Sequence, residues 1–152
     1  GSNLYGQLCV NETTGQNVTT PYLIPDVDVT TVSSFDAIRS SSYISFYDGS
    51  VGACGRNNFG QLGDGSNVDR VRTVLEPLPD ASPIRNVYVG PSSESVFFVS
   101  ENGDTYATGL NDKAQLGVGD QLNRNILTLV DFGEEGQAPI EISASGDHTL
   151  SA

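Results

Sequence analysis

The feature that most constrains the fold of this chain is an internal repeat with a spacing of 54 residues, as between Gly6 and Gly60. Three segments, Gly1–Asn11, Gly55–Gly65 and Gly109–Gly119, align on this spacing without a gap. The positions that define the repeated segment are Gly1, Asn3, Gly6, Gln7, Leu8, Gly55, Asn57, Gly60, Gln61, Leu62, Gly109, Asn111, Gln115 and Leu116. Repeats of this length are typical of architectures in which each unit buries its core against its neighbours, so we expect several similar units in a row.

The repeated segment has the composition of a compact turn. Its glycines adopt a positive φ without steric cost, and its asparagine can bond to nearby backbone, as asparagine does in turns. Its glutamine has two donors and an acceptor, enough to tie the turn to a neighbouring strand end, and we expect its leucine in the core. Asn11 stands where the other copies have Gly65 and Gly119, and asparagine tolerates the left-handed region better than most residues.

Short apolar runs between the turns predict strands, and no stretch has a helical period. The expected strands are residues 27–32, 42–47, 51–54, 84–89, 96–100, 105–108 and 140–145. The first is expected because apolar and polar residues alternate in it. Asp48-Gly49 and Asn102-Gly103 stand between apolar runs, which is the pattern of tight β-hairpins. About four strands per repeat predict an all-β chain of propeller blades, each a four-stranded antiparallel sheet.

A known family is similar at these same residues. The motifs are the turn Gly55–Gly65, the proline-containing strand Pro83–Gly90, the stretch Asp147–Leu150 and the hairpin at Asn102-Gly103. This pattern resembles the regulator-of-chromosome-condensation repeat, and the resemblance covers two full copies and most of a third. It implies a propeller, because members of the family typically form seven-bladed rings.

The chain departs from the family pattern at several positions. Cys9 and Ala114 stand at the positions of a usual glycine, and Cys54 and Thr108 stand where an aromatic residue is common. The family's histidine is present only as His148, and serine or glutamate fills that position in the first two copies. These departures weaken the transfer of function more than the transfer of fold.

The repeats divide the chain into residues 1–54, residues 55–108 and an incomplete third repeat, residues 109–152. Together they predict one propeller segment of about three blades. An open segment would expose blade faces and unpaired strand edges, which invite association. We therefore expect protein partners or further blades, in the same chain or in trans. A seven-bladed ring, a homo-oligomer or a polymer would each supply such blades.

The two cysteines, Cys9 and Cys54, leave two alternatives open. A disulfide between them would close an interval of 45 residues, and the chain-entropy model gives such a bond about 4 kcal/mol, less any strain. The other alternative is a pair of reduced, buried thiols that act as small hydrophobic side chains.

The charge balance excludes some partners. The chain has 19 Asp and Glu against 7 Lys and Arg, a net charge of −12. A nucleic-acid groove and an anionic membrane surface both require clustered basic residues, so we expect neither partner. No apolar run reaches the roughly 18 residues of a membrane-spanning helix, so membrane insertion is not expected.

Residues that could support catalysis or bind a metal are few. His148 is the only histidine, and without a nucleophile or acid at a recognisable spacing it is expected to bond a neighbouring turn. Asp64–Asp69 and Asp26–Asp28 gather oxygen atoms but do not follow the pattern of a calcium-binding EF-hand loop, so both are expected to be solvated turns. Glu134-Glu135 is expected in an exposed loop. We predict no catalytic residue, no metal site and no cofactor.

Two glycosylation sequons begin at Asn11 and Asn17. Composition alone predicts about this many sequons, so their number is no evidence, but both fall in a polar loop where a glycan would stand in solvent. With a possible disulfide, they favour an extracellular or cell-surface location. The alternative location is cytoplasmic or nuclear.

Three classes of function compete. The first is a non-enzymatic structural or protein-interaction module, part of an extracellular glycoprotein or a fibrous assembly. The second, which the family resemblance implies, is an intracellular adaptor or a guanine-nucleotide exchange factor for a small GTPase. The third is a propeller enzyme that cleaves glycans with paired carboxylates. The repeats and the acidic surface favour the first.

Overall fold

A computed structural model of the chain describes residues 1–10, 15, 17–75, 78, 81–90, 92–132 and 142–151. These residues form strands and, within the described ranges, no helix. The strands are β1 (Val32–Ala37), β2 (Ser41–Phe46), β3 (Val51–Gly55), β4 (Arg70–Val74), β5 (Ile84–Val89), β6 (Ser95–Ser100), β7 (Thr105–Gly109), β8 (Arg124–Leu129), β9 (Ile142–Ala144) and β10 (Thr149–Ser151). They make two antiparallel four-stranded sheets, ordered β1-β2-β3-β4 and β5-β6-β7-β8, and the pair β9-β10.

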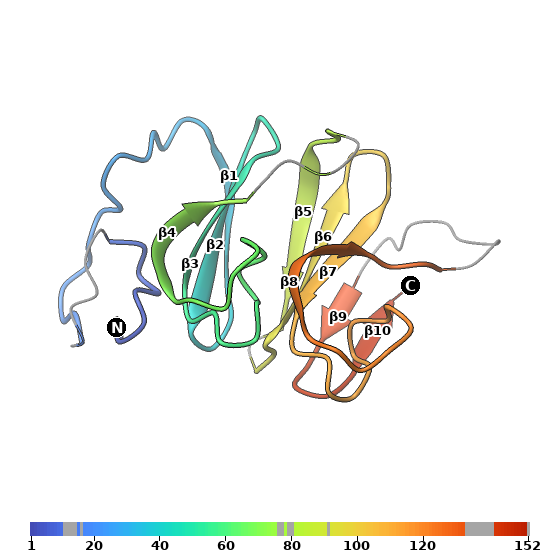
Figure 1. Cartoon of the computed structure of the whole chain (residues 1–152). Coiled ribbons are helices and arrows are strands. Elements are labelled where there is room, and N and C mark those ends of the chain that lie inside the picture. Colours follow the sequence, from blue (N-terminus) through green and yellow to red (C-terminus); the bar gives the residue numbers. More distant parts are fainter. Residues whose placement is uncertain are drawn as a thin grey trace.

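The two four-stranded sheets stand side by side (Figure 1). β1 contacts β5 and β5 contacts β9, so the first strands lie close to one another. β4 and β8 are the last strands of their sheets. This arrangement, in which successive sheets repeat one order of strands, is that of a partial β-propeller.

The core lies between neighbouring sheets. β6 shows this most clearly, because every residue of Ser95–Ser100 is buried. Successive side chains of a strand point to opposite faces, and here both faces are covered. Phe98 packs with Tyr43 of β2, with the ring centroids 6.1 Å apart and the planes at 75°. Phe97 belongs instead to a cluster with Ile142 of β9.

The expected hairpins are confirmed. Asp48-Gly49 joins β2 to β3, and Asn102-Gly103 joins β6 to β7, both antiparallel pairs. The strand expected at residues 140–145 contains β9, although residues 140 and 141 lie outside the described ranges.

The strand expected at residues 27–32 is wrong, because the chain turns there and β1 begins only at Val32. The side chain of Asp28 accepts hydrogen bonds from the backbone N–H and the hydroxyl of Thr30, at 2.9 and 2.7 Å. Thr31 N–H donates to the carbonyl of Asp28 at 3.0 Å. The alternation of apolar and polar residues is typical of a strand, but it also occurs in this turn. Asp28 closes the turn with its carboxylate.

The sheets are out of phase with the sequence repeats. The boundary between residues 1–54 and residues 55–108 falls at the end of β3, inside the first sheet. β4 of that sheet therefore comes from the second repeat, and β8 of the second sheet comes from the third repeat. The turn Gly55–Gly65 lies on the connection from β3 to β4. Each sheet thus joins two successive repeats by covalent chain and by backbone hydrogen bonds.

The described residues contain no helix that is long and apolar enough to cross a membrane.

Candidate functional site

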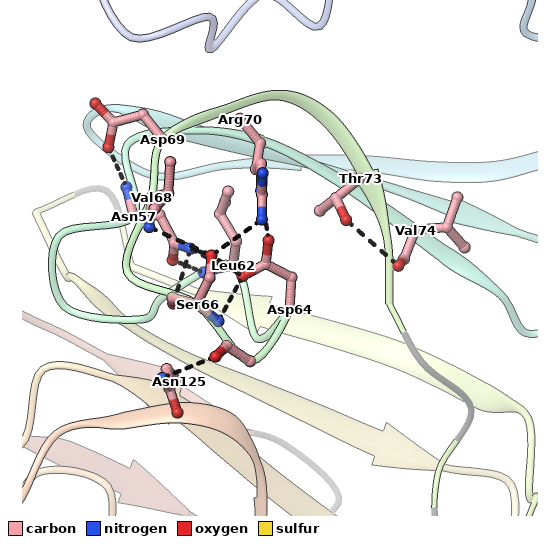
Figure 2. A network of polar contacts seen from close by, with 11 residues as sticks. Asn57, Leu62, Asp64, Ser66, Val68, Asp69, Arg70, Thr73, Val74 and Asn125 are labelled. Atoms are coloured by element: carbon pink, nitrogen blue, oxygen red, sulfur yellow. Dashed lines mark hydrogen bonds and ion pairs between the residues drawn. The ribbon is translucent and has the colours of Figure 1, made fainter.

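The repeated turn is organised around a buried asparagine, seen best in the second copy (Figure 2). Oδ1 of Asn57 accepts a hydrogen bond from the backbone N–H of Leu62 at 2.9 Å. Nδ2 of Asn57 donates to Asp64 Oδ1 and to the carbonyl of Ser66, both at 3.0 Å. One side chain therefore holds the start, the middle and the end of the turn together.

The other two copies use their asparagine in the same way. Asn3 Oδ1 accepts from Leu8 N–H at 3.0 Å, and Asn111 Oδ1 accepts from Leu116 N–H at 2.9 Å. Nδ2 of Asn111 also donates to the carbonyl of Leu122 at 3.1 Å. Like Asn57, both asparagines are fully buried. Their role in the structure is to bond the turn itself.

The glutamine of each copy bonds within the turn and, in two copies, also beyond it. Oε1 of Gln7, Gln61 and Gln115 accepts from the N–H of the residue two positions earlier, at 2.9, 2.9 and 2.8 Å. Nε2 of Gln61 donates to Oε2 of Glu94 at 2.8 Å, which links the turn to the residue just before β6. Gln115 reaches the carbonyl of Gly146 at 3.5 Å.

Glu94 is the residue at this junction that the sequence analysis did not identify as part of a site. It stands 54 residues before His148, at the family's histidine position. Burial raises the pKa of the Glu94 carboxyl above its ordinary value. The hydrogen bond from Gln61 and the charges of Arg56 and Arg39 oppose this shift without cancelling it.

Acidic residues at the end of the turn or just after it pair with arginines of the last strand of each sheet. Arg70 Nε lies 2.7 Å from Asp64 Oδ2, and Arg124 Nη2 lies 2.6 Å from Asp120 Oδ2. Burial would raise the pKa of Asp64, but hydrogen bonds from Arg70 and Ser66 outweigh it and lower the pKa. The hydrogen bond from Arg124 is the main cause of the lowered pKa of Asp120.

In the segment Asp64–Asp69, which was expected to be a solvated turn, both aspartates bond the turn itself through their side chains. Asp64 bonds Asn57 and Arg70, and Asp69 Oδ1 accepts from the N–H of Asn57 at 2.8 Å (Figure 2). In the part of the chain that the structure describes, no group of three or more His, Cys, Asp or Glu side chains could hold a metal ion.

The last strand of each sheet packs directly on the glycine of the preceding copy's turn. Gly60 has a φ of +82°, and a Cβ there would lie 2.4 Å from Cα of Asn125 on β8. Asn125 also accepts from Gly65 N–H at 2.8 Å and donates from Nδ2 to the Gly65 carbonyl at 3.1 Å. The third copy has Ala114 at this place, with a φ of 59°.

A disulfide joins Cys9 and Cys54, with the two Cα atoms 5.4 Å apart. Of the two alternatives, the structure thus has the bond rather than the thiols. The equivalent pair one repeat later is Gly63 and Thr108, where a Cβ on Gly63 would lie 3.2 Å from Thr108 Cγ2.

The remaining candidates lie apart from the repeated turns. His148 is exposed, and its Nδ1 lies 3.0 Å from the hydroxyl of Ser145 in its own turn. Asn17 is exposed and its backbone bridges to Ser2. Asn11 and Glu134-Glu135 lie outside the described residues.

Comparison with known proteins finds relatives that share this repeat. The chain is 31% identical over 105 residues to the ultraviolet-B receptor UVR8 of Arabidopsis thaliana, an alignment of 69% of this chain and 22% of the receptor. It is 32% identical over 98 residues to the human X-linked retinitis pigmentosa GTPase regulator. That alignment covers 64% of this chain and 9% of the regulator. The chain thus spans about a fifth or less of these relatives. No family model matches the sequence.

Solved structures show the same fold over nearly the whole chain. Prp20p of Saccharomyces cerevisiae superposes with a TM-score of 0.82 at 23% identity, over 99% of this chain and 38% of Prp20p. Human WBSCR16 gives 0.81 at 21% identity, over 96% of this chain and 37% of that chain. The crystal structure of Kap60 bound to yeast RCC1 (Prp20) contains a chain that superposes with a TM-score of 0.84 at 22% identity. The match covers 98% of this chain and 36% of the matched chain.

The fold defines a segment of a β-propeller with a buried turn at each junction between sheets. The repeat sequence and the relatives define it further: the chain is built of regulator-of-chromosome-condensation (RCC1)-like repeats.

Proposed function

We propose that the chain is a non-enzymatic protein-interaction module, in which a propeller segment presents its loops and sheet edges to protein partners. The observation that carries this proposal is the use of the repeated polar side chains. Asn57 and Asn111 are fully buried, and their amides bond the turns. The repeated amides therefore serve the architecture, and the exposed loops and edges are the surfaces left for recognition.

A repeated exposed side chain supports an interaction surface. Val68 and Leu122 stand 54 residues apart, each in the loop before the last strand of its sheet. Their exposed fractions are 58% and 66%. Two neighbouring blades thus offer an apolar side chain at the same place, and we choose these two positions as the contact to be tested.

The protein partners of structural neighbours support the same class of function. Prp20p is described with binding to Gsp1p and histones, and yeast RCC1 (Prp20) was solved bound to Kap60. All of these partners are proteins. We therefore propose that this chain also binds proteins, and we assign none of these particular partners to it.

The experiment is quantitative binding after cross-linking. A photo-reactive residue at Val68 captures partners in an extract of the source cells, and binding of the purified partner is then titrated. We expect saturable binding that is lost when Val68→Ser and Leu122→Ser are combined, with unchanged thermal unfolding. Val29→Ser, at an exposed site on another loop, is the matched control. Binding that is unchanged in the double variant would contradict the proposal. Chemical conversion of the captured molecule by the chain would contradict it as well.

Nucleotide exchange on a small GTPase is the alternative that the relatives suggest, since one is named a GTPase regulator. The chain covers 38% of Prp20p and carries a net charge of −12. We expect no acceleration of fluorescent-nucleotide release from purified candidate small GTPases. Catalysed release would favour the exchange factor instead.

The module is also proposed to work with further blades, supplied in the same chain or in trans. Support comes from the pair β9-β10, which has the place of β5 and β6 but pairs with no third strand within the described residues. The mass of the native species tests this: a native mass of a single chain of 16.0 kDa would contradict it.

An oxidising, extracellular or cell-surface location is proposed on the disulfide between Cys9 and Cys54, because such bonds persist mainly in oxidising compartments. The exposure of Asn17 is compatible with a glycan. Mass spectrometry of the native protein should find the disulfide, with a glycan at Asn11 or Asn17. Free thiols and unmodified sequons would instead assign the chain to the cytoplasm or nucleus.

A further inference from the structure

The basic side chains of this acidic protein differ in how their donors are used. All seven of them lie in the part of the chain that the structure describes. The guanidinium groups of Arg39, Arg56 and Arg85 form no hydrogen bond or ion pair with any described residue. The other four bond oxygen atoms of the chain: Arg70 with Asp64, Arg72 with the carbonyl of Pro25, Lys113 with Asp112 and Arg124 with Asp120.

Arg39 and Arg56, which we call the arginine pair, are brought together by the backbone of the first sheet. Arg39 lies on the connection from β1 to β2, and Arg56 directly follows β3. The N–H of Arg56 donates to the carbonyl of Ser40, the residue after Arg39, at 2.9 Å. Ser41 Oγ donates to the carbonyl of Arg56 at 2.7 Å. The arginine pair is therefore anchored on adjacent backbone at one end of the first sheet.

The second sheet adds one carboxylate to this place. Glu94 lies just before β6, and its Oε2 accepts from Gln61 Nε2 at 2.8 Å. Burial raises the pKa of Glu94, and the charges of Arg56 and Arg39 act against that rise. Both guanidinium groups thus lie close enough to act on one carboxyl, although neither forms an ion pair with it in the described structure. Two arginines and one ionised carboxylate leave a local excess of one positive charge.

The ring of Tyr5 holds one of the guanidinium groups by its flat face. Cζ of Arg56 lies 5.2 Å from the centroid of that ring. A stacked guanidinium keeps its N–H donors free, because they point outward in its plane. Arg39 is exposed and Arg56 is half-buried. The arginine pair therefore offers donors to a group outside the chain.

The charge of the site indicates which anion it suits. The whole chain has a net charge of −12, so anions are repelled from most of it and a local positive excess is selective. One carboxylate would neutralise this excess. A phosphate group, with a charge of about −1.5 to −2 at pH 7, would leave negative charge beside Glu94. The same net charge opposes the approach of a second copy of this chain.

We propose that the arginine pair binds the carboxylate of an aspartate or glutamate side chain on a partner protein. The guanidinium groups donate N–H bonds to the carboxylate oxygens, in the paired geometry that arginine favours. Tyr5 keeps Arg56 in position, and Glu94 disfavours more highly charged anions. The inference rests on the proposed interaction function and specifies the chemistry of one contact.

The test is a titration of the 15N-labelled full chain with the capped peptide acetyl-Gly-Glu-Gly-amide, followed by nuclear magnetic resonance. The glutamate side chain carries the only charge of this peptide. We expect saturable shifts of the Nε–H signals of Arg39 and Arg56, and none with acetyl-Gly-Gln-Gly-amide. The absence of a saturable shift, or equal shifts with the glutamine peptide, overturns the proposal. Tighter binding of acetyl-Gly-phosphoserine-Gly-amide would assign the site to phosphate and overturn it as well.

Arg39→Gln tests the site without disturbing the core, because Arg39 is exposed. It should weaken binding of the glutamate peptide at least about threefold, the effect of a lost hydrogen bond. Arg56→Lys keeps the charge but loses the planar pair of donors, so it should weaken binding too. The matched control is Arg85→Gln, since Arg85 is also exposed but lies on β5. Equal affinities of the Arg39→Gln and Arg85→Gln chains would overturn the proposal.

Two further outcomes decide between partners. A chain that sediments as a dimer, and becomes a monomer with Arg39→Gln, would assign the arginine pair to a second copy and contradict the proposal. If the glutamate peptide fails while the captured partner still depends on Val68 and Leu122, the arginine site is wrong and the interaction module stands.

Discussion

Single asparagines hold the repeated turns, because each side chain satisfies groups that are far apart along the turn. Asn57 is fully buried and bonds Leu62, Asp64 and Ser66. Removing it would leave the N–H of Leu62 unsatisfied inside the protein. An unsatisfied buried group costs more than a hydrogen bond contributes, so these asparagines stabilise the fold.

Asn57→Ala is therefore expected to lower the free energy of unfolding by about 3 kcal/mol. Urea unfolding followed by circular dichroism measures the effect. The neighbouring Asn58 is exposed, so Asn58→Ala is the matched control and should change stability by less than about 0.5 kcal/mol. Equal losses in the two variants would contradict the role assigned to Asn57.

Gly60 and Ala114 occupy the same place in successive turns but have different surroundings. Gly60→Ala puts a Cβ 2.4 Å from the Asn125 Cα at a φ of +82°. We expect a loss of at least about 2 kcal/mol, since the left-handed backbone alone costs about 1–2 kcal/mol.

Ala114→Gly is the reciprocal change. It relieves the positive φ of Ala114 but makes the unfolded chain more flexible, so its net effect should lie within about 0.5 kcal/mol of zero. Thermal unfolding of both variants tests the pair. A Gly60→Ala chain as stable as the parent would show that β8 does not pack on this turn.

At the scale of elements, the turns join neighbouring sheets through contacts that are distant in sequence. Gln61 donates to Glu94, 33 residues away, and this contact places a carboxylate in a half-buried junction. Because burial raises the pKa of Glu94, the folded chain binds that proton more tightly than the unfolded chain does. Stability from this group is therefore lost as the pH rises through its folded-state pKa.

Glu94→Gln should accordingly gain stability relative to the parent as the pH rises from about 4 to about 7. The glutamine keeps an acceptor for Gln61 and carries no charge. Urea unfolding across this pH range measures the difference, with the exposed Glu101→Gln as the control. A difference that is constant with pH, or that reverses its direction, would contradict the assignment.

The disulfide ties the first turn to β3. Cys9→Ala combined with Cys54→Ala should lower the free energy of unfolding by about 4 kcal/mol, the chain-entropy value for a loop of 45 residues. A reducing agent should destabilise the parent by a similar amount and leave the double variant unchanged. A parent chain whose urea midpoint is insensitive to reduction would contradict this.

The sequence predicted the blades well because its repeats carry the same information three times. Hairpins at Asp48-Gly49 and Asn102-Gly103 follow from local turn chemistry. The strand at residues 27–32 failed because alternation also arises where Asp28 closes a turn. The sequence did not reveal that each sheet takes its last strand from the following repeat, because a repeating pattern does not mark where a unit begins.

The site was harder to predict than the fold. The sequence left the bond between Cys9 and Cys54 open, because only the fold brings their two Cα atoms to 5.4 Å. The contact of Gln61 with Glu94 depends on how two sheets meet. Such contacts belong to the packing of sheets, which one sequence does not specify residue by residue.

At the scale of the whole molecule, the sheets are successive sectors that share their cores. Tyr43 of the first sheet and Phe98 of the second belong to one buried cluster with Leu62 of the turn between them. This arrangement gives the second sheet a neighbour on each side, the first sheet and the pair β9-β10. It also leaves the outermost faces and edges of the segment for protein contacts.

The most direct test of this architecture is a nuclear Overhauser measurement between the rings of Tyr43 and Phe98 in the folded chain. Their centroids lie 6.1 Å apart in an edge-to-face arrangement, so we predict cross-peaks between the ring protons of the two sheets. A folded chain in which each ring shows contacts within its own sheet and none to the other would contradict the account.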